Sequence, residues 1–510
     1  IICVCLSFIM CLQTFSVITF AQKPVKEKSL NQAETPAYAV EEVKSKREAN
    51  VKHFRMSDGT YTAASYDAPV HYNDGGVWRD IDNTLAETTD IEENTAVYEN
   101  TDNPLKAKFA KKSNSKNILK LQNGEYKLMF SLLGDKNKNV EAQKTAVKDD
   151  KNITTLENTE SRIIYENIFD NVDIEYVISG TKLKENIVIR KKLNDYTFRY
   201  EIKANGLTMS LEDNAVIAKD NDKTVFCIPA PYMFDADGEA SDAVTYSLEK
   251  SNGNKYILTI TADKDWINNA HRKFPVIVDP TVQIPEIDNN TFYYAIERNN
   301  EITHYDYGVG HINNALRYSN LSNSQSTATS LYMKVDLPYL DRFLSWYEDP
   351  PNSVAHGAKV VNAKLNLAYD ATVYAGSESD DAVYAVYRNT STWQSNFTFS
   401  NRPSKAYNIE DYLEKDTWDI VSYNPSTGQQ TGVEKQPIFT ADITHLVNDW
   451  YTGAEENNGI YITPSIESVG LTDIGHRIYY HHSVIYPRLS VSYICSVGLE
   501  DYFSYTTTDL

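Results

Sequence analysis

Histidine side chains are the first candidates for metal binding or acid–base chemistry, and the sequence spaces them poorly for either. The 510-residue chain has 10 histidines, and none of them falls in an HExxH or HxH pattern. His481 and His482 are neighbours, but adjacent side chains on a strand point to opposite faces, so one shared metal is not expected. The chain also lacks a GxSxG elbow, a Walker A loop and a GxGxxG turn. We therefore predict no catalytic residue and no metal ligand, and leave a structural Ca²⁺ open without assigning residues to it.

Paired carboxylates could hydrolyse a glycosidic bond, since a glycosidase needs two of them at a suitable separation. The chain contains 70 Asp and Glu residues, so neighbouring carboxylates arise from composition alone. Glu455 with Glu456, and Asp380 with Asp381, are more simply explained as charges on loops. A polysaccharide-degrading enzyme is kept as an alternative, but the prediction is that the protein is not an enzyme.

Aromatic side chains in loops could bind sugars, because an apolar ring face stacks on the C–H groups of a pyranose. Trp393 is the best candidate, since it lies in a segment of small polar residues, NTSTWQSNFTFSNRP. Trp346, Tyr347 and Trp418 are further candidates at predicted loops or strand ends. The alternative for each ring is core packing, because aromatic residues dominate hydrophobic cores.

The sequence predicts one helix among the strand-like segments. An apolar stripe at i, i+3, i+4 and i+7 predicts a helix over residues 440–451. Thr440 or Asp442 could cap its start, and Gly453 stands where a left-handed residue would end it. We expect the stripe to close a hydrophobic core, and its members are Ile443, Leu446, Val447 and Trp450.

Composition favours sheets and an acidic surface. Tyrosine is abundant, at 36 residues, and apolar residues alternate with polar ones along most of the chain. The formal net charge is -21, which disfavours sequence-independent contact with phosphate backbones, so no nucleic acid is expected as a partner. The predicted fold class is all-β, with an N-terminal β-sheet domain followed by a jelly-roll β-sandwich that contains one short helix.

Five segments follow from these patterns. Residues 1–21 are apolar and uncharged and end in a small-residue site, which predicts a signal peptide. Residues 22–50 are polar and charged, as in a flexible spacer. Residues 51–282 and 283–495 both alternate with period two and form the two β domains. Residues 496–510 are expected to lead into a repeat region that the chain lacks.

Distributed motifs give the two β domains a family resemblance. The first resembles the N-terminal region of bacterial wall-associated proteins with Rhs/YD repeats, through YTAASYDAPVHYNDGGVWRDIDNTL, IIYENIFDNVDIEYVISGTKLKENIVI and FPVIVDPTV. The second resembles the DNRLRE domain of such proteins, a jelly roll related to carbohydrate-binding modules, through YMKVDLP, VVNAKLNL, TFSNRP, FTADITHLVNDWYTG and YPRLSVSY. The resemblance implies a secreted, cell-surface protein of a Gram-positive bacterium.

The sequence therefore predicts a non-catalytic surface protein, cell-wall associated or extracellular, whose jelly roll binds wall or extracellular polysaccharide. The missing C-terminal repeat region is the other expected partner. A structural scaffold for a repeat-containing toxin or adhesin, with no ligand of its own, is the main rival.

Overall fold

The computed structural model describes residues 37–134, 140–148, 160–236, 240–282, 284, 292–298, 300–305, 311–321, 325–340, 358–370, 383–394, 396–423, 430–465, 474–479 and 488–495. The predicted signal peptide at residues 1–21 and the predicted stub at residues 496–510 lie outside this part. Within it, no helix is long and apolar enough to cross a membrane.

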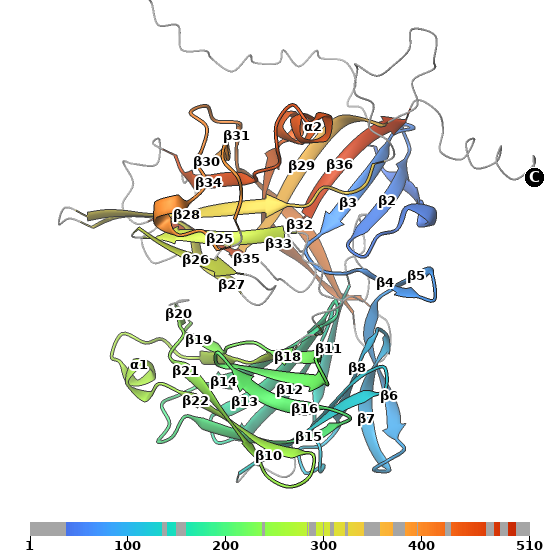
Figure 1. Cartoon of the computed structure of the whole chain (residues 1–510), viewed down its shortest axis with the longest axis vertical. Coiled ribbons are helices and arrows are strands. Elements are labelled where there is room, and N and C mark those ends of the chain that lie inside the picture. The colour runs from blue at the N-terminus through green and yellow to red at the C-terminus, as the bar shows by residue number, and fades with distance from the viewer. Residues whose placement is uncertain are drawn as a thin grey trace, which may run out of the picture. The chain divides into compact units, whose positions relative to one another are not determined.

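The all-β prediction is confirmed (Figure 1), since antiparallel strands make up most of the described chain. The predicted helix is α2, Thr444–Thr452. A second, five-residue helix, α1, Lys264–Asn268, was not expected from the sequence. Asp263 caps it by accepting a hydrogen bond from the backbone N–H of Trp266 at 2.6 Å.

An eight-stranded antiparallel sheet forms much of the N-terminal part, in the order β21-β22-β15-β10-β9-β8-β7-β6. Apolar side chains from one face of this sheet enter a large core, while lysines and glutamates alternate with them on the other face. The strand bounds are Val244–Lys250 (β21), Lys255–Ala262 (β22), Thr197–Asn205 (β15), Tyr126–Leu133 (β10), Leu119–Asn123 (β9), Leu105–Ala110 (β8), Thr95–Asp102 (β7) and Asp82–Asp90 (β6).

A second ladder contributes to the same core. It runs through Gln143–Lys148 (β11), Glu160–Phe169 (β12), Val172–Ser179 (β13), Lys182–Ile189 (β14), Val276–Asp279 (β23), Thr281–Val282 (β24), Tyr232–Phe234 (β19) and Ala240–Ser241 (β20). A three-stranded sheet adds Thr208–Glu212 (β16), Ala215–Asp220 (β17) and Lys223–Ile228 (β18). Residues from all three sheets share one hydrophobic cluster, so they fold around a common core.

The C-terminal part is built from two ladders around another core. One joins Ala39–Glu42 (β1), Val51–Met56 (β2), Tyr61–Tyr66 (β3), Arg488–Cys495 (β36), Ala358–Asp370 (β29), Gln430–Asp442 (β33) and Glu414–Tyr423 (β32). The other joins Glu301–Tyr305 (β26), Phe292–Arg298 (β25), Gln325–Val335 (β28), Ile460–Pro464 (β34), Tyr384–Arg388 (β30) and Asp411–Tyr412 (β31). His311–Leu321 (β27) and Ile474–Tyr479 (β35) link them, because β27 pairs with β28 and β35, and β35 pairs with β29.

The helix α2 lies against β29, as Figure 1 shows. Gly453 ends it at a φ of 71°, in the left-handed conformation that the sequence predicts. The helix begins later than expected, because β33 continues to Asp442 and the carboxylate of that residue accepts a hydrogen bond from the backbone N–H of Thr444 at 3.0 Å. Ile443, Leu446 and Val447 are buried in the core between the ladders, whereas Trp450 is half-buried against it.

Two strands near the N-terminus belong to the C-terminal ladder. The register of β3 on β36 aligns Tyr61 with Tyr493 and Tyr66 with Arg488. Val51, Tyr61 and Ala63 then enter the same core as the residues of β29 and β36. The sequence placed residues 51–66 with the first β domain, because strand patterns in one chain do not reveal which partner each strand chooses.

The predicted flexible spacer at residues 22–50 is wrong for the residues after Tyr38. These residues form β1, a 3₁₀ turn at Lys44–Lys46 (η1), and a buried segment in which Arg47 and Asn50 are 7% and 4% exposed. The composition resembles that of a solvated linker, but its charged groups pair with one another and with the hairpin that follows: Arg47 binds both Glu42 and Asp80.

A short hairpin follows β3. Its strands are His71–Asp74 (β4) and Val77–Asp80 (β5), and Gly75 and Gly76 between them have φ values of 61° and 95°. Positive φ at both turn residues gives the strands the twist that a two-residue hairpin needs. The Asn-Asp-Gly-Gly sequence at residues 73–76 therefore forms the turn of this hairpin.

Candidate functional site

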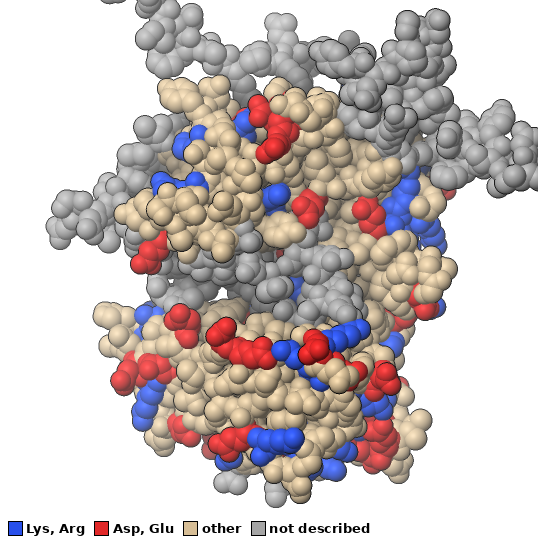
Figure 2. Space-filling model, in the orientation of Figure 1, with Lys and Arg blue, Asp and Glu red and all other residues tan. Residues whose placement is uncertain are grey.

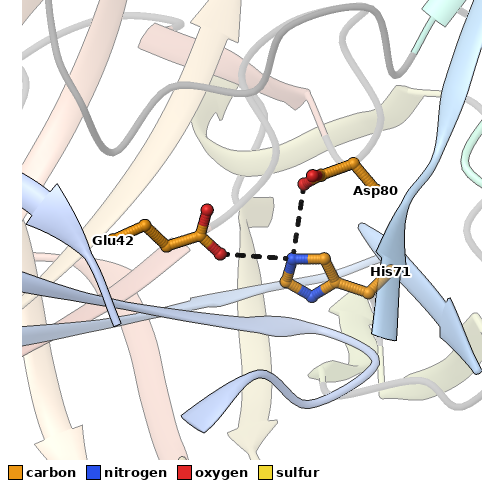
Figure 3. A group of neighbouring side chains, drawn as sticks. All are labelled: Glu42, His71 and Asp80. Atoms are coloured by element: carbon orange, nitrogen blue, oxygen red, sulfur yellow. Dashed lines mark ion pairs between the residues drawn. The ribbon is translucent and has the colours of Figure 1, made fainter. Parts of the chain in front are cut away.

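Glu42, His71 and Asp80 converge from β1, β4 and β5, as Figure 3 shows. The Nε2 atom of His71 lies 3.6 Å from a carboxylate oxygen of Glu42 and 3.5 Å from one of Asp80. The imidazole ring of His71 is fully buried, while about half of the Asp80 side chain is exposed. Candidate ligand atoms of the three residues lie within 4.8 Å of one another, so the group has the composition and spacing of a metal-binding triad.

Two basic residues already balance these carboxylates. Arg47 donates from Nε to Glu42 at 2.6 Å and from Nη2 to Asp80 at 2.8 Å. Lys52 donates to the other oxygen of Asp80 at 2.7 Å. Because Arg47 and Lys52 supply the positive charge that a bound cation would bring, the five residues fit an ion-pair network better than a metal site.

The pKa shifts in the network agree with this interpretation. Burial alone would raise the pKa of Glu42, but the interactions with His71 and Arg47 outweigh it and lower that pKa to about 2. Burial is likewise outweighed at Asp80, whose pKa is held well below its usual range by His71 and Lys52. Both carboxylates are therefore ionised at neutral pH.

His71 is held in one orientation by the backbone. Its Nδ1 atom lies 2.7 Å from the carbonyl oxygen of Glu48, which can only accept, so Nδ1 carries a proton. Burial by itself would lower the pKa of the ring, but the carboxylates of Asp80 and Glu42 beside Nε2 outweigh it and raise that pKa. The network thus stabilises the imidazolium form relative to a free histidine, which works against metal binding at Nε2.

A second candidate is an open groove at one edge of the C-terminal part, which we call the tyrosine groove. Its volume is about 520 Å³, within the range of small-molecule sites. Tyr407 is 97% exposed, so its ring is fully accessible to a ligand. The groove is lined by Tyr387, Lys405, Ala406, Tyr407, Ile409, Tyr412 and Ser465.

Backbone pairing holds the wall of this groove against β30. The N–H of Ala406 donates to the carbonyl of Arg388 at 2.9 Å, and the N–H of Glu410 donates to the carbonyl of Val386 at 2.8 Å. Residues 407–409 project between these two anchor points. The exposed ring of Tyr407 is therefore carried by a loop that is fixed at both ends to a strand, which limits the entropy lost when a ligand binds.

Lys405 provides the charge in the groove. Its Nζ atom lies 3.6 Å from the centre of the Tyr387 ring, in a cation–π contact. Partial burial lowers the pKa of Lys405. The neighbouring carboxylate of Glu410 is taken by Arg388, which also pairs with Asp449 at 3.1 Å. The groove can thus offer ring faces and one ammonium group to the same ligand.

The predicted sugar-binding residues are not brought together in the described part of the chain. Trp393 is half-buried, its ring meets Phe397 edge-on with centroids 5.2 Å apart, and it does not line the tyrosine groove. Trp346 and Tyr347 lie outside the described residues. Trp418 belongs to β32, but its side chain is not among those described. A role for these four residues stays a prediction.

Sequence reasoning missed the groove and the ion network for different reasons. Tyr407 and Tyr412 lie in the segment KAYNIEDYLEK, where tyrosines among Asn, Asp and Glu were a readable signal for exposed rings. Glu42 and Arg47 gave no signal at all, because their partners come from a hairpin about 30 residues further on.

Comparison with known proteins adds a biological setting. The chain is 27% identical over 263 residues to the tRNA nuclease WapA of Bacillus subtilis and to the tRNA3(Ser)-specific nuclease WapA of Bacillus spizizenii. It is 23% identical over 216 residues to the wall-associated protein of Geobacillus stearothermophilus. These relatives place the protein at the cell wall or outside the cell. The predicted localisation and the predicted cell-wall association are thereby confirmed.

The extent of these matches differs. The match to the two WapA proteins covers 49% of this chain but 11% of their length, so the chain spans about a ninth of each. The match to the Geobacillus protein covers 41% of this chain and 81% of that protein. No family model matches the chain, so the resemblance to the DNRLRE domain stays a prediction.

Two predictions are overturned by the names of the relatives. The prediction that the protein is not an enzyme conflicts with relatives that are named tRNA nucleases. The same names contradict the prediction that no nucleic acid is a partner. The prediction on nucleic acid failed because a net charge of -21 averages over the whole chain and does not exclude a local basic surface. The prediction on catalysis failed because a search for short motifs detects only the catalytic sites that carry such motifs.

Proposed function

We propose that the protein attaches to the cell wall by binding polysaccharide in the tyrosine groove. The observation that carries the proposal is the ring of Tyr407, which is 97% exposed on a loop anchored at both ends and stands beside Tyr387 and Tyr412. Sugar-binding sites present such rings because a pyranose offers C–H groups to the ring face and hydroxyls to polar neighbours. The resemblance to carbohydrate-binding jelly rolls supports the same reading.

Retention on insoluble cell walls tests this function. We expect the whole chain to sediment with purified Gram-positive walls, and Tyr407→Ala to lose most of that retention because the stacking surface is gone. Tyr339→Ala is the matched control, since Tyr339 is 66% exposed and lies outside the groove. Equal retention of both variants would show that the groove is not the binding site.

A scaffold without a ligand of its own is the rival for this region. It predicts that the wild-type chain is not retained on walls or on any soluble polysaccharide. Retention that is lost in Tyr407→Ala and kept in Tyr339→Ala excludes it.

Contact with nucleic acid is a second candidate function, favoured by the relatives named as tRNA nucleases. One row of residues crosses the outer face of the eight-stranded sheet, and in it Lys108 is aligned with Lys120 and Lys203 with Lys255. Like charges directly opposite on a sheet repel each other, so the pairs cost stability unless an anion compensates them. Asp90 compensates Lys120 at 3.1 Å, Glu99 compensates Lys108 at 3.7 Å and Glu201 compensates Lys255 at 2.7 Å. Lys203 has no carboxylate partner in the described part of the chain.

The face that Figure 2 presents carries acidic and basic side chains interspersed, without one large patch of a single sign. Any contact with phosphates along the lysine row would therefore be local and sensitive to salt. An electrophoretic shift of labelled tRNA, with a parallel cleavage assay, tests this function. We expect Lys108→Gln with Lys203→Gln to weaken the shift, and no shift by the wild-type chain at 50 mM salt would reject the candidate.

A further inference from the structure

Lys405 is an uncompensated cation in a strongly acidic protein. Within the described residues no carboxylate forms an ion pair with its Nζ atom, although the chain carries a formal charge of -21. The carboxylate closest in sequence, Glu410, is held by Arg388 through Nε. The ammonium group thus keeps its capacity for an anionic partner from outside the chain.

The position of Lys405 couples this charge to the ring surfaces. Its Nζ atom sits 3.6 Å from the centroid of Tyr387, and the bridge between Asn389 and Lys405 fixes the backbone that carries it. The lysine head is therefore placed over the Tyr387 ring at one wall of the groove. If a ligand stacks on Tyr407, its substituent on the side of Tyr387 contacts this ammonium group.

We propose that the tyrosine groove binds an anionic saccharide, with Lys405 pairing with its acid group and the tyrosines stacking on its ring. The inference rests on the proposed function and names the substrate class for the same site. A carboxylate of an acidic sugar and a phosphodiester of a wall polymer share the negatively charged oxygens that an ammonium group recognises. A neutral glucan has the ring but lacks this group, so it makes only the stacking contact.

The test compares acidic and neutral polymers that have the same sugar backbone. Binding of the whole chain to polygalacturonate and to its methyl ester is measured by titration calorimetry, for wild type, Lys405→Gln, Lys405→Arg and Tyr407→Ala. Lys364→Gln on β29 is the matched control, because Lys364 is also exposed and lies outside the groove. Thermal unfolding of each variant shows that it is folded.

The expected result separates charge from stacking. Lys405→Gln should weaken binding of the acidic polymer by about fivefold, the effect of losing one exposed ion pair worth about 1 kcal/mol, and leave the methyl ester unchanged. Lys405→Arg should retain the preference for the acidic polymer, and Tyr407→Ala should lose binding of both polymers.

Cell walls treated with hydrofluoric acid, which removes phosphate polymers, distinguish the two sources of negative charge. Retention that falls after treatment identifies a phosphodiester, and unchanged retention identifies a carboxylate.

Two results would overturn the inference in different ways. If Lys405→Gln binds both polymers as wild type does while Tyr407→Ala binds neither, the groove is a glycan site but its ligand is not selected by charge. If wild type binds neither polymer and is not retained on walls, the proposed function fails together with the inference.

Discussion

The Nη2 atom of Arg47 lies 2.8 Å from Oδ2 of Asp80, and this contact connects the segment before β2 to the β4–β5 hairpin. Arg47 is also bound to Glu42, so one guanidinium group joins two carboxylates from separate strands. Of the two strands, β1 pairs with β2 in the ladder that continues through β3 to β36, and β5 leads along the chain into β6 of the eight-stranded sheet. The network therefore stabilises the point at which the chain passes from one sheet system to the next.

Removal of the Arg47 guanidinium should be costly. Arg47→Met leaves Glu42, whose side chain is 16% exposed, without its main partner, and we expect a loss of about 3 kcal/mol in the free energy of unfolding. Urea unfolding measures it. Arg55→Met is the control, because the side chains of the Arg55–Glu41 pair are 38% and 50% exposed and such a pair contributes less than about 1 kcal/mol. Equal effects of the two substitutions would mean that the network is not structural.

The pH dependence of the free energy of unfolding should show the contribution of His71. Its pKa is raised in the folded state, so its contribution is fully present below the unfolded value of about 6.5 and is lost as the pH rises through the folded value. Glu42 has the opposite sign, since its pKa falls to about 2 and its contribution is lost only as the pH drops through that value. The network should therefore stabilise most at weakly acidic pH.

His71→Asn isolates this effect, because an amide can still donate to the Glu48 carbonyl but does not titrate. We expect the difference in urea midpoint between wild type and variant to shrink from pH 6 to pH 9. Burial also raises the pKa values of Asp67 and Glu185 to about 7, but both titrate in the two proteins and cancel in the difference. A difference that stays constant over this range would show that folding does not raise the pKa of His71.

Two glycines with positive φ provide a matched pair for backbone strain. Gly459 has a φ of 76°, and a Cβ added there would lie 2.3 Å from the carbonyl oxygen of Met333. Gly453 has a φ of 71° with nothing within 4 Å of such a Cβ. We expect Gly453→Ala to cost about 1 kcal/mol from its conformation alone, and Gly459→Ala to cost at least about 2 kcal/mol more because β28 must move. Thermal unfolding checks the order, and equal costs would contradict the close contact.

The two ends of the apolar stripe on α2 should differ in their effect on stability. Leu446 is 1% exposed, so Leu446→Ala should cost about 2 to 5 kcal/mol through the cavity it leaves. Trp450 is only half-buried against the same core, so Trp450→Ala should cost less, about 1 to 3 kcal/mol. Denaturant unfolding of both variants tests the order. A larger loss for Trp450→Ala would place that ring at the centre of the core instead of its edge.

The local structure of this chain follows from its sequence because it depends on interactions between residues close together in the chain. Gly453 ends α2 and Gly75 with Gly76 turn the β4–β5 hairpin, because each needs only a backbone that tolerates positive φ. Period-two alternation likewise predicts that the chain is built from strands, since it depends on neighbours two residues apart. The all-β class and the position of the helix were therefore predictable.

Only the tertiary structure decided which distant segments meet. β3 pairs with β36, some 430 residues along the chain, and no local pattern records that choice of partner. The same holds for Glu42 and Arg47, whose charges resemble those of a linker until His71 and Asp80 lie beside them. It holds also for the tyrosine groove, since Tyr387 and Tyr407 acquire a common surface only when the loop is pinned to β30. The energy of pairing two strands depends on how the whole sheet packs. The ion network and the tyrosine groove depend on that pairing, so they cannot be predicted from local sequence.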